Sequence, residues 1–260
     1  MPYVDNGGVR IHYELEGDGP PLILQHGFTS SLQNWYAHGY VEGLQSAYRL
    51  ILIDARGHGL SDKPHDSAAY DLKLRVSDVT AVLDELDIAR CHYLGYSMGG
   101  RIGFGIARYA PERVYSLMIG GMHPYDSGRN VPLQERTRLL EQGMEAYVAN
   151  SESQSGPIDP DRRAMLLAND PKALLAAITA PRGPSNMEDV LPAMRMPCLL
   201  SVGEADGFFP GVEETAKHIP EVKFVSFPGL DHGQTSRGSE VVLPHVTEFL
   251  SEVSRAVAAD

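Results

Sequence analysis

Apolar residues along this chain fall into short runs of two kinds, and each kind predicts a different type of strand. Val9 to Leu15 alternates apolar and polar positions, which is typical of a strand with one exposed face. Pro21 to Gln25 and Arg49 to Ile53 are almost continuously apolar, as in strands that are buried on both faces of a parallel sheet. We therefore predict a sheet that begins with an antiparallel edge hairpin and continues with parallel strands.

Helical patterns separate the later strands. Leu72 to Leu86 places its apolar residues at helical spacing, and Met98 to Tyr109 follows a glycine-rich turn. This alternation of strand and helix is typical of βαβ units. A closing helix is predicted from about Glu240 to Val257. Four further apolar runs bring the sheet to seven or eight strands: Cys91 to Leu94, Val114 to Ile119, Cys198 to Val202 and Val222 to Phe227.

The stretch from about Met122 to Leu191 interrupts this rhythm. It is rich in Pro, Gly and Asn, and it contains no run that predicts a strand. Ser151 to Gly156 predicts a loop between two helices of this stretch. We expect one α/β core made of residues 1–121 and 192–260, with residues 122–191 inserted as a helical lid. The helical patterns of the insertion are Leu133 to Val148, Asp161 to Ala168 and Pro171 to Ala180.

Length and charge agree with one such domain and argue against several partners. A chain of 260 residues is long enough to bury a sizeable core. Its formal net charge of -12 argues against a nucleic-acid partner, which calls for a basic face, and against binding to anionic lipid. No apolar run approaches the roughly 20 residues of a membrane span, and the first residues lack the pattern of a signal peptide. We expect a cytoplasmic protein without a membrane partner, whose oligomeric state the sequence does not indicate.

Cysteine and histidine spacing gives no sign of a disulfide or a metal site. Cys91 and Cys198 each lie inside an apolar run, where a free thiol behaves as a small hydrophobic group, so we expect both to be reduced. The ten histidines show neither HxH nor HExxH spacing. We therefore expect no metal and no cofactor.

Gly95-Tyr96-Ser97-Met98-Gly99 has the spacing of a nucleophile elbow. The segment follows an apolar run and opens a helical pattern, and the small residues on either side of Ser97 permit a sharp turn from strand to helix. The start of a helix also favours negative charge at this position. Ser97 is therefore the predicted nucleophile. The alternative is a glycine-rich turn that only closes a βα unit.

A serine nucleophile needs a general base, and that base needs a carboxylate to orient it. His232 follows the last predicted strand in a loop, where its side chain can reach the carboxyl end of the sheet. Asp206 comes just after the strand Cys198 to Val202, and it gives the chain order Ser, Asp, His. Glu204 and Asp126 are the alternative carboxylates. Three other histidines lie within predicted strands or helices and are poorer bases: His92, His218 and His245.

Backbone N–H groups usually bind the oxyanion that forms during acyl transfer. The N–H of Met98, directly after the nucleophile, is one predicted donor. The second is the N–H of Phe28, in the turn after the strand Pro21 to Gln25, where Gly27 lets the backbone approach. The Phe28 side chain is also expected to line an acyl or alcohol pocket. An ordinary loop at His26-Gly27 is the alternative.

Five segments of the chain together form a recognisable set. In chain order they are His26-Gly27-Phe28, Asp54 to Asp62, Gly95 to Gly99, Gly203 to Asp206 and Gly229 to His232. With these segments the chain resembles the α/β-hydrolase superfamily over nearly its whole length. The resemblance implies an α/β-hydrolase fold, with a mostly parallel eight-stranded sheet flanked by helices and a lid that matches residues 122–191. It also implies that His58 is a packing and hydrogen-bonding residue, outside catalysis.

The resemblance further implies hydrolysis of a small-molecule ester or lactone through an acyl-enzyme. Epoxide hydrolases and haloalkane dehalogenases of this fold use an aspartate nucleophile, and Ser97 excludes both. Phe28 and the segment around Ser97 are similar to those of small-lid carboxylesterases, cofactor-free haloperoxidases or perhydrolases, and enol-lactonases. Hydrolases of C–C bonds typically carry further small residues where this chain has Phe28-Thr29, so they are a less favoured alternative.

Arg101, in the helix after Ser97, leaves a second chemistry open. The segment from Gly95 to Arg101 is similar to that of the menaquinone-pathway synthase of this fold, which eliminates pyruvate and whose arginine helps to hold a carboxylated substrate. A structural ion pair is the simpler interpretation of Arg101. A ligand receptor that has kept the scaffold is a third hypothesis, which the intact Ser97, Asp206 and His232 disfavour. Further arginines that could hold such a substrate are Arg129, Arg136 and Arg138.

The lining of the pocket is the least predictable feature. A Met or aromatic residue at helical spacing packs in the core more often than it contacts a ligand. The candidate substrate-binding residues are Gly27, Tyr96, Arg101, Met122, Tyr125, Met144, Tyr147 and Phe208.

Overall fold

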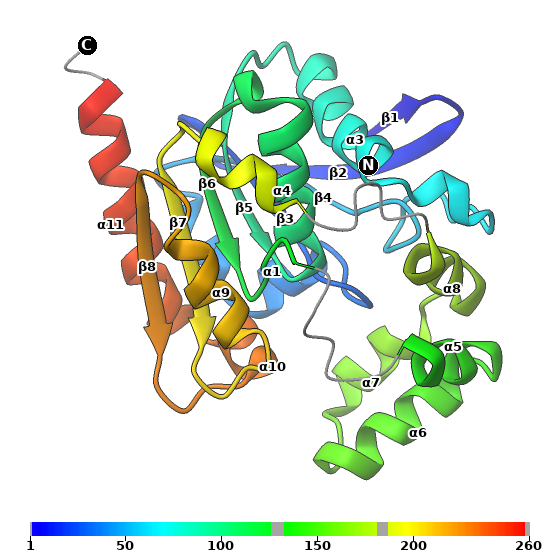
Figure 1. The fold of residues 1–260 in the computed structure, drawn as a ribbon. Coiled ribbons are helices and arrows are strands. Elements are labelled where there is room, and N and C mark those ends of the chain that lie inside the picture. Colours follow the sequence, from blue (N-terminus) through cyan, green and yellow to red (C-terminus); the bar gives the residue numbers. More distant parts are fainter. Residues whose placement is uncertain (1, 126–132, 181–186, 258–260) are drawn as a thin grey trace.

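The fold is built on one sheet of eight strands (Figure 1). The computed structural model describes residues 2–125, 133–180 and 187–257. The strand order is β1-β2-β4-β3-β5-β6-β7-β8. β1 (Tyr3–Asn6) pairs antiparallel with β2 (Val9–Glu16), which pairs antiparallel with β4 (Arg49–Ile53). All later neighbours are parallel, so the predicted change from an antiparallel edge to a parallel sheet is confirmed.

The parallel strands all end at one edge of the sheet, the lower edge in Figure 1. β3 (Pro21–Gln25), β4 and β8 (Val222–Phe227) have their predicted bounds. The other three extend one or two residues beyond the predicted runs, because their pairing with neighbouring strands continues to those residues. They are β5 (Cys91–Tyr96), β6 (Val114–Gly120) and β7 (Cys198–Gly203).

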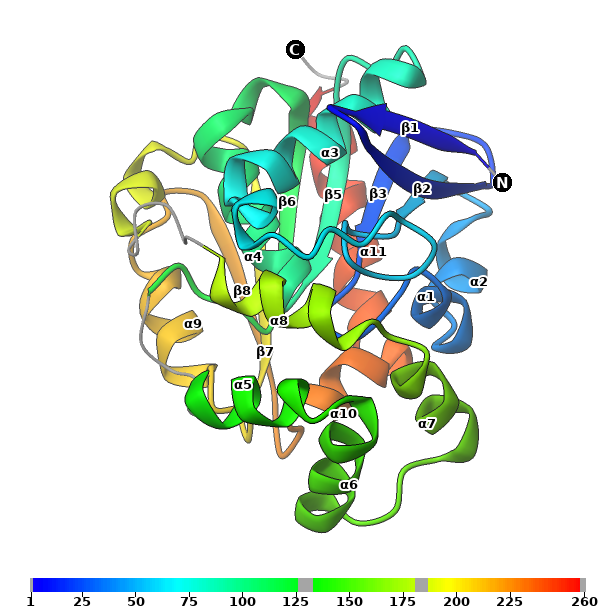
Figure 2. The ribbon, with the colours of Figure 1, turned by 90° about the vertical axis from the view of Figure 1, so that its right-hand side faces the viewer.

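Helices cover both faces of the sheet, which explains the continuous apolar runs (Figures 1 and 2). Alternate side chains of a strand point to opposite faces. Ile23 and Ile51 therefore pack beneath one helical layer, whereas Leu24 and Leu52 pack beneath the other. The first layer contains α3 (Leu72–Glu85), α4 (Met98–Tyr109) and α9 (Phe209–Ala216), and the second contains α1 (Gln33–Ala37), α2 (Tyr40–Leu44) and α11 (Ser239–Val257). Within the described residues, no helix combines the length and apolarity that a membrane span requires.

The described chain between β6 and β7 is helical, as predicted, and contains no strand. Four of its helices lie together beside the lower edge of the sheet (Figure 1). A fifth element, η3 (Glu188–Ala193), instead packs Val190 and Leu191 into the main core. The core therefore includes residues before the predicted boundary at residue 192. The four helices are α5 (Leu133–Glu141), α6 (Met144–Ser155), α7 (Pro160–Leu167) and α8 (Pro171–Thr179).

Two details of the insertion differ from the prediction. The single helix predicted over Leu133 to Val148 is two helices, because Gly143, with a φ of 100°, separates α5 from α6. The loop predicted over Ser151 to Gly156 is the end of α6, which stops at Gly156 in a left-handed conformation. The hydroxyl of Ser151 donates to the carbonyl of the preceding turn, so the helix accommodates this polar run.

Both cysteines are free and buried, as the sequence predicted. Burial raises the pKa of the Cys91 and Cys198 thiols to about 12, because the thiolate cannot be solvated there. These thiols therefore act as apolar packing groups.

Candidate active site

Ser97 lies at the turn between β5 and α4, with φ of 54° and ψ of -109°. This backbone conformation is sterically disfavoured for a residue with a side chain, and such strain is common at functional sites. The flanking glycines make the turn possible. A Cβ at Gly95 would overlap the carbonyl oxygen of Gly99, and a Cβ at Gly99 would overlap that of Gln25.

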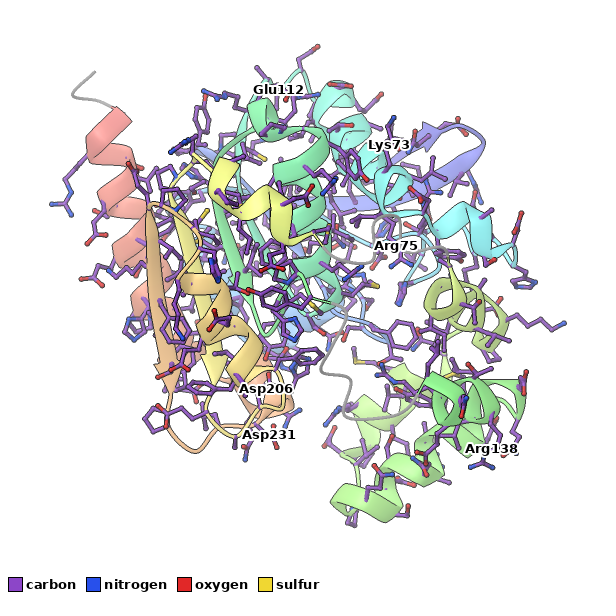
Figure 3. All side chains as sticks on the ribbon, in the orientation of Figure 1. Lys73, Arg75, Glu112, Arg138, Asp206 and Asp231 are labelled. Atoms are coloured by element: carbon purple, nitrogen blue, oxygen red, sulfur yellow. The ribbon has the colours of Figure 1, made fainter. Side chains whose placement is uncertain are left out.

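His232 and Asp206 form a hydrogen-bonded pair at the carboxyl end of the sheet. Nδ1 of His232, the first residue of α10 (His232–Arg237), donates to Oδ2 of Asp206 over 2.6 Å. The Asp206 side chain is fully buried, and its other oxygen accepts the N–H of Phe208 at 3.0 Å. Figure 3 shows Asp206 at the end of the sheet opposite Glu112, together with Asp231, which caps α10. Because Nδ1 carries the shared proton, Nε2 of His232 is left to accept another.

Two aromatic rings hold the imidazole of His232. The ring centroid of Tyr96 lies 5.1 Å from that of His232, and the centroid of Phe208 lies 5.3 Å from it. The hydroxyl of Tyr96 also donates to the backbone carbonyl of His232 at 2.7 Å. The base is therefore fixed through its side chain and its backbone.

Ser97 and His232 line the same cavity, which has a volume of about 230 Å³. Gly27, Phe28 and Tyr96, three of the residues that the sequence proposed, line it as well. Of the alternative carboxylates, Glu204 lies elsewhere, because its Oε1 accepts the hydroxyl of Ser226. Asp126 is outside the described residues.

The turn after β3 places Gly27 beside the nucleophile, since a Cβ built there would lie 3.4 Å from the Cβ of Ser97. His26 fixes this turn: Nδ1 donates to the carbonyl of Gly27 at 2.8 Å, and Nε2 accepts the N–H of Ala55 at 3.1 Å. Burial lowers the pKa of His26, in agreement with a neutral ring. Within the described chain, the N–H groups of Phe28 and Met98 form no hydrogen bond. Both are therefore open to a ligand.

The structure does not bring the other candidate substrate-binding residues to this cavity. Met144 and Tyr147 belong to a cluster with Leu140 of the insertion, against which Phe28 also packs, and Met122 packs against the main core. The Tyr125 ring packs at a tilt against His123, with 5.4 Å between the ring centroids. Phe208 packs against His232 and is not among the described residues that line the cavity. Helical spacing alone could not separate these core positions from lining positions.

The arginines singled out from the sequence lie in different places. Arg101 is not among the described residues of the cavity wall. Burial lowers the pKa of Arg75 to about 10, and the positive charge of Arg101 lowers it further. Arg136 lines the cavity, with its guanidinium carbon 5.4 Å from the ring centroid of Phe28. Arg138 is exposed on α5, well away from Asp206 in Figure 3. Arg129 is outside the described residues.

Sequence reasoning missed two further arginines of the cavity wall, Arg162 on α7 and Arg237 on α10. The spacing of Arg237, one helical turn after Gly233, could have indicated that these two residues share one face of α10. Nothing in the sequence around Arg162 gives a comparable signal.

In the part of the chain that the structure describes, no group of three or more His, Cys, Asp or Glu side chains could hold a metal ion.

Several known proteins are similar to this chain in sequence or in fold. A family model described as alpha/beta hydrolase fold matches residues 20–166. A Bacillus subtilis protein, provisionally named 2-succinyl-6-hydroxy-2,4-cyclohexadiene-1-carboxylate synthase, is 28% identical over 94% of this chain and 96% of its own. The pimeloyl-[acyl-carrier protein] methyl ester esterase of Nitrosomonas europaea is 28% identical over 85% and 92%, respectively. The solved structure of Est816, described as an N-acyl homoserine lactone degrading enzyme, is 27% identical, covers 95% of this chain and 100% of its own, and superposes with a TM-score of 0.78.

Proposed function

Because the chain belongs to the α/β-hydrolase family, we propose that it is a serine hydrolase that cleaves a carboxylic ester or lactone through an acyl-enzyme. One arrangement carries this proposal. Ser97 and His232 line one cavity, while Nδ1 of His232 is bonded to the buried Asp206. An ester and a lactone are the substrates in the names of two similar proteins, which supports the same chemistry.

Acylation uses each of these groups. Oγ of Ser97 attacks the carbonyl carbon and gives its proton to Nε2 of His232. The carboxylate of Asp206 stabilises the resulting imidazolium. The open N–H groups of Phe28 and Met98 donate to the oxyanion, beside the positive end of α4. The imidazolium then protonates the leaving oxygen as its bond to carbon breaks.

Deacylation repeats these steps with water. His232 takes a proton from the attacking water, and the tetrahedral intermediate collapses as Ser97 regains its proton. An ester yields a free alcohol in the first half-reaction and an acid in the second. A lactone yields a single hydroxy acid, because its alcohol remains attached to the acyl group.

The insertion contributes part of the cavity wall, which supports its proposed role as a lid. Arg136 of α5 and three residues of α7 line the cavity that contains Ser97, and the α7 residues are Arg162, Met165 and Leu166. A small substrate in this cavity is therefore enclosed between the sheet and the insertion.

An organophosphonate probe and an ester panel test the proposal. We expect the probe to label Ser97, as located by peptide mass spectrometry, and we expect turnover of esters and lactones of graded acyl length. Ser97→Ala should abolish both the labelling and the turnover, while the chain stays folded. Unchanged turnover in Ser97→Ala would contradict the proposal.

The Bacillus subtilis relative favours a second candidate, a lyase or synthase reaction on the same residues. In that reaction the serine or histidine removes a proton from carbon instead of activating water. This candidate predicts poor turnover across the ester panel and a strong dependence on Arg101. Full esterase activity in Arg101→Ala would argue against it.

A further inference from the structure

The wall of the cavity is cationic, although the chain is strongly acidic. The sequence contains 34 Asp and Glu but only 22 Lys and Arg. The described wall nevertheless contains Arg136, Arg162 and Arg237, and no acidic residue. The overall composition does not account for the positive charge of the wall. This positive charge indicates that the cavity binds a negatively charged group.

Arg237 lies against Gly233, the residue that follows the base. It is on α10, one helical turn after Gly233, and a Cβ at Gly233 would lie only 2.8 Å from Nη1 of Arg237. The absence of a side chain at Gly233 therefore gives the guanidinium room to lie against the backbone next to His232.

Arg162 approaches from the insertion. It lines the cavity and its side chain is partly exposed, which places it at the mouth. Partial burial lowers its pKa, and the positive charge of Arg237 lowers it further, so the two guanidinium groups act on each other. Asp231, the exposed cap of α10, partly offsets this repulsion.

Neither guanidinium forms an ion pair in the described chain. The adjacent Arg163, in contrast, pairs with Glu152 at 3.2 Å. Other described arginines also have carboxylate partners, namely Arg10, Arg56, Arg108 and Arg113. Two guanidinium groups that are not ion-paired with a carboxylate of the protein leave N–H donors that match a planar carboxylate.

His38, on the same wall, adds no positive charge. Burial lowers its pKa, and the charges of Arg237 and Arg162 lower it further. Its Nε2 lies 3.4 Å from Nδ2 of Asn34, which can donate to it. The anion is therefore bound by the arginines, with the neutral His38 beside them.

We propose that Arg162 and Arg237 form an anion subsite beside Ser97, and that the substrate is a small ester or lactone that carries a carboxylate. This inference rests on the proposed function. The cavity of about 230 Å³ lies below the range of about 300–1,000 Å³ that is usual for drug-sized ligands, so the carboxylate and the scissile bond belong to one compact molecule.

Matched substrates test the subsite. Monomethyl esters of short dicarboxylic acids are compared with methyl esters of monocarboxylic acids of the same chain length. We expect wild-type kcat/KM to favour the charged series. Arg237→Gln and Arg162→Gln should each lower kcat/KM for that series about tenfold to hundredfold, the loss expected for a hydrogen bond to a charged group. Activity on the neutral series should stay within about twofold.

Arg163→Gln is the control, because it makes the same charge change one residue along α7, outside the cavity wall. It should leave both series unchanged. Arg237→Lys keeps the positive charge but loses the planar guanidinium group. Its kcat/KM for the charged series should lie between those of wild type and Arg237→Gln. The subsite would be refuted if the wild-type protein turned over the two series equally. It would also be refuted if Arg162→Gln and Arg237→Gln lowered kcat/KM equally for both series.

Two results separate this inference from the proposed function. If hydrolysis depends on Ser97 but not on Arg162 or Arg237, the proposed hydrolase function is supported and the subsite is refuted. If no ester is cleaved, calorimetry with the same monomethyl esters and wild-type protein decides the question. Binding that is lost in Arg237→Gln supports the subsite without the proposed chemistry, and no binding refutes it.

Discussion

The hydroxyl of Tyr96 donates a 2.7 Å hydrogen bond to the backbone carbonyl of His232. Tyr96 directly precedes Ser97, so the end of β5 positions both the nucleophile and the backbone of the proposed base. Burial raises the pKa of Tyr96 well above its usual value, which keeps the hydroxyl protonated as a donor. Tyr96 is therefore a positioning residue that links the two halves of the site.

Tyr96→Phe should remove this bond and keep the ring that packs on the imidazole. A neutral hydrogen bond contributes about 0.5–1.5 kcal/mol, so we expect kcat/KM to fall about twofold to tenfold, mostly through kcat. Steady-state kinetics on the best ester measures the effect. Tyr115→Phe, at the amino end of β6, is the control and should have no effect. Wild-type kcat in Tyr96→Phe would show that the bond does not position the base.

Asp206→Asn should nearly abolish turnover. The amide cannot stabilise the imidazolium and favours the wrong tautomer of His232, a change that costs about 10⁴-fold in kcat in a serine protease triad. Glu204→Gln is the matched control, because the Glu204 carboxylate accepts the Ser226 hydroxyl and does not contact His232. Comparable losses in the two variants would remove Asp206 from the proposed triad.

Gly99→Ala should destabilise the fold and misplace the nucleophile. Its methyl group would overlap the backbone carbonyl of Gln25, which cannot move without displacing β3. We expect a cost of at least about 1–3 kcal/mol in the free energy of unfolding, measured by chemical denaturation. Gly103→Ala in the same helix should cost less, because its methyl group meets the side chains of Ile119 and Tyr93 at 3.2 Å. Equal stability of both variants would contradict this reading of the elbow.

The fold and the proposed triad could be predicted because both depend on local sequence signals. Continuous apolar runs mark buried parallel strands, and the carboxyl ends of parallel strands meet at one edge. Ser97, Asp206 and His232 each follow such a strand, so topology alone brings them to the same edge of the sheet.

The cavity wall could not be predicted in the same way. It depends on how α7 and α10 are packed against the sheet, and this packing decides that Arg162 faces the cavity whereas Arg163 faces Glu152. Met144 and Tyr147 have the same helical spacing as lining residues, yet they pack inside the insertion. Orientation of a helix face is a tertiary property, which one sequence does not specify.

Acid should destabilise the chain through its buried histidines. Burial lowers the pKa of His58 to about 3 and of His92 to about 4, and it also lowers that of His26. In the unfolded chain these rings titrate near pH 6.5, so below about pH 6.5 the unfolded state binds more protons than the folded state. The stability linked to keeping these rings neutral is fully present above about pH 6.5, and it is lost as the pH falls toward their pKa values in the folded chain. Each ring should contribute roughly 1 kcal/mol per pH unit in that range.

Urea denaturation between about pH 7 and about pH 5 measures this dependence. His92→Gln removes one titrating group, so its free energy of unfolding should fall less steeply with pH than that of wild type, by roughly 1 kcal/mol per pH unit. The slope is the readout, because loss of the bond between His92 and Ser116 lowers stability at every pH. A wild-type slope in His92→Gln would mean that this ring is protonated in the folded chain as easily as in the unfolded one.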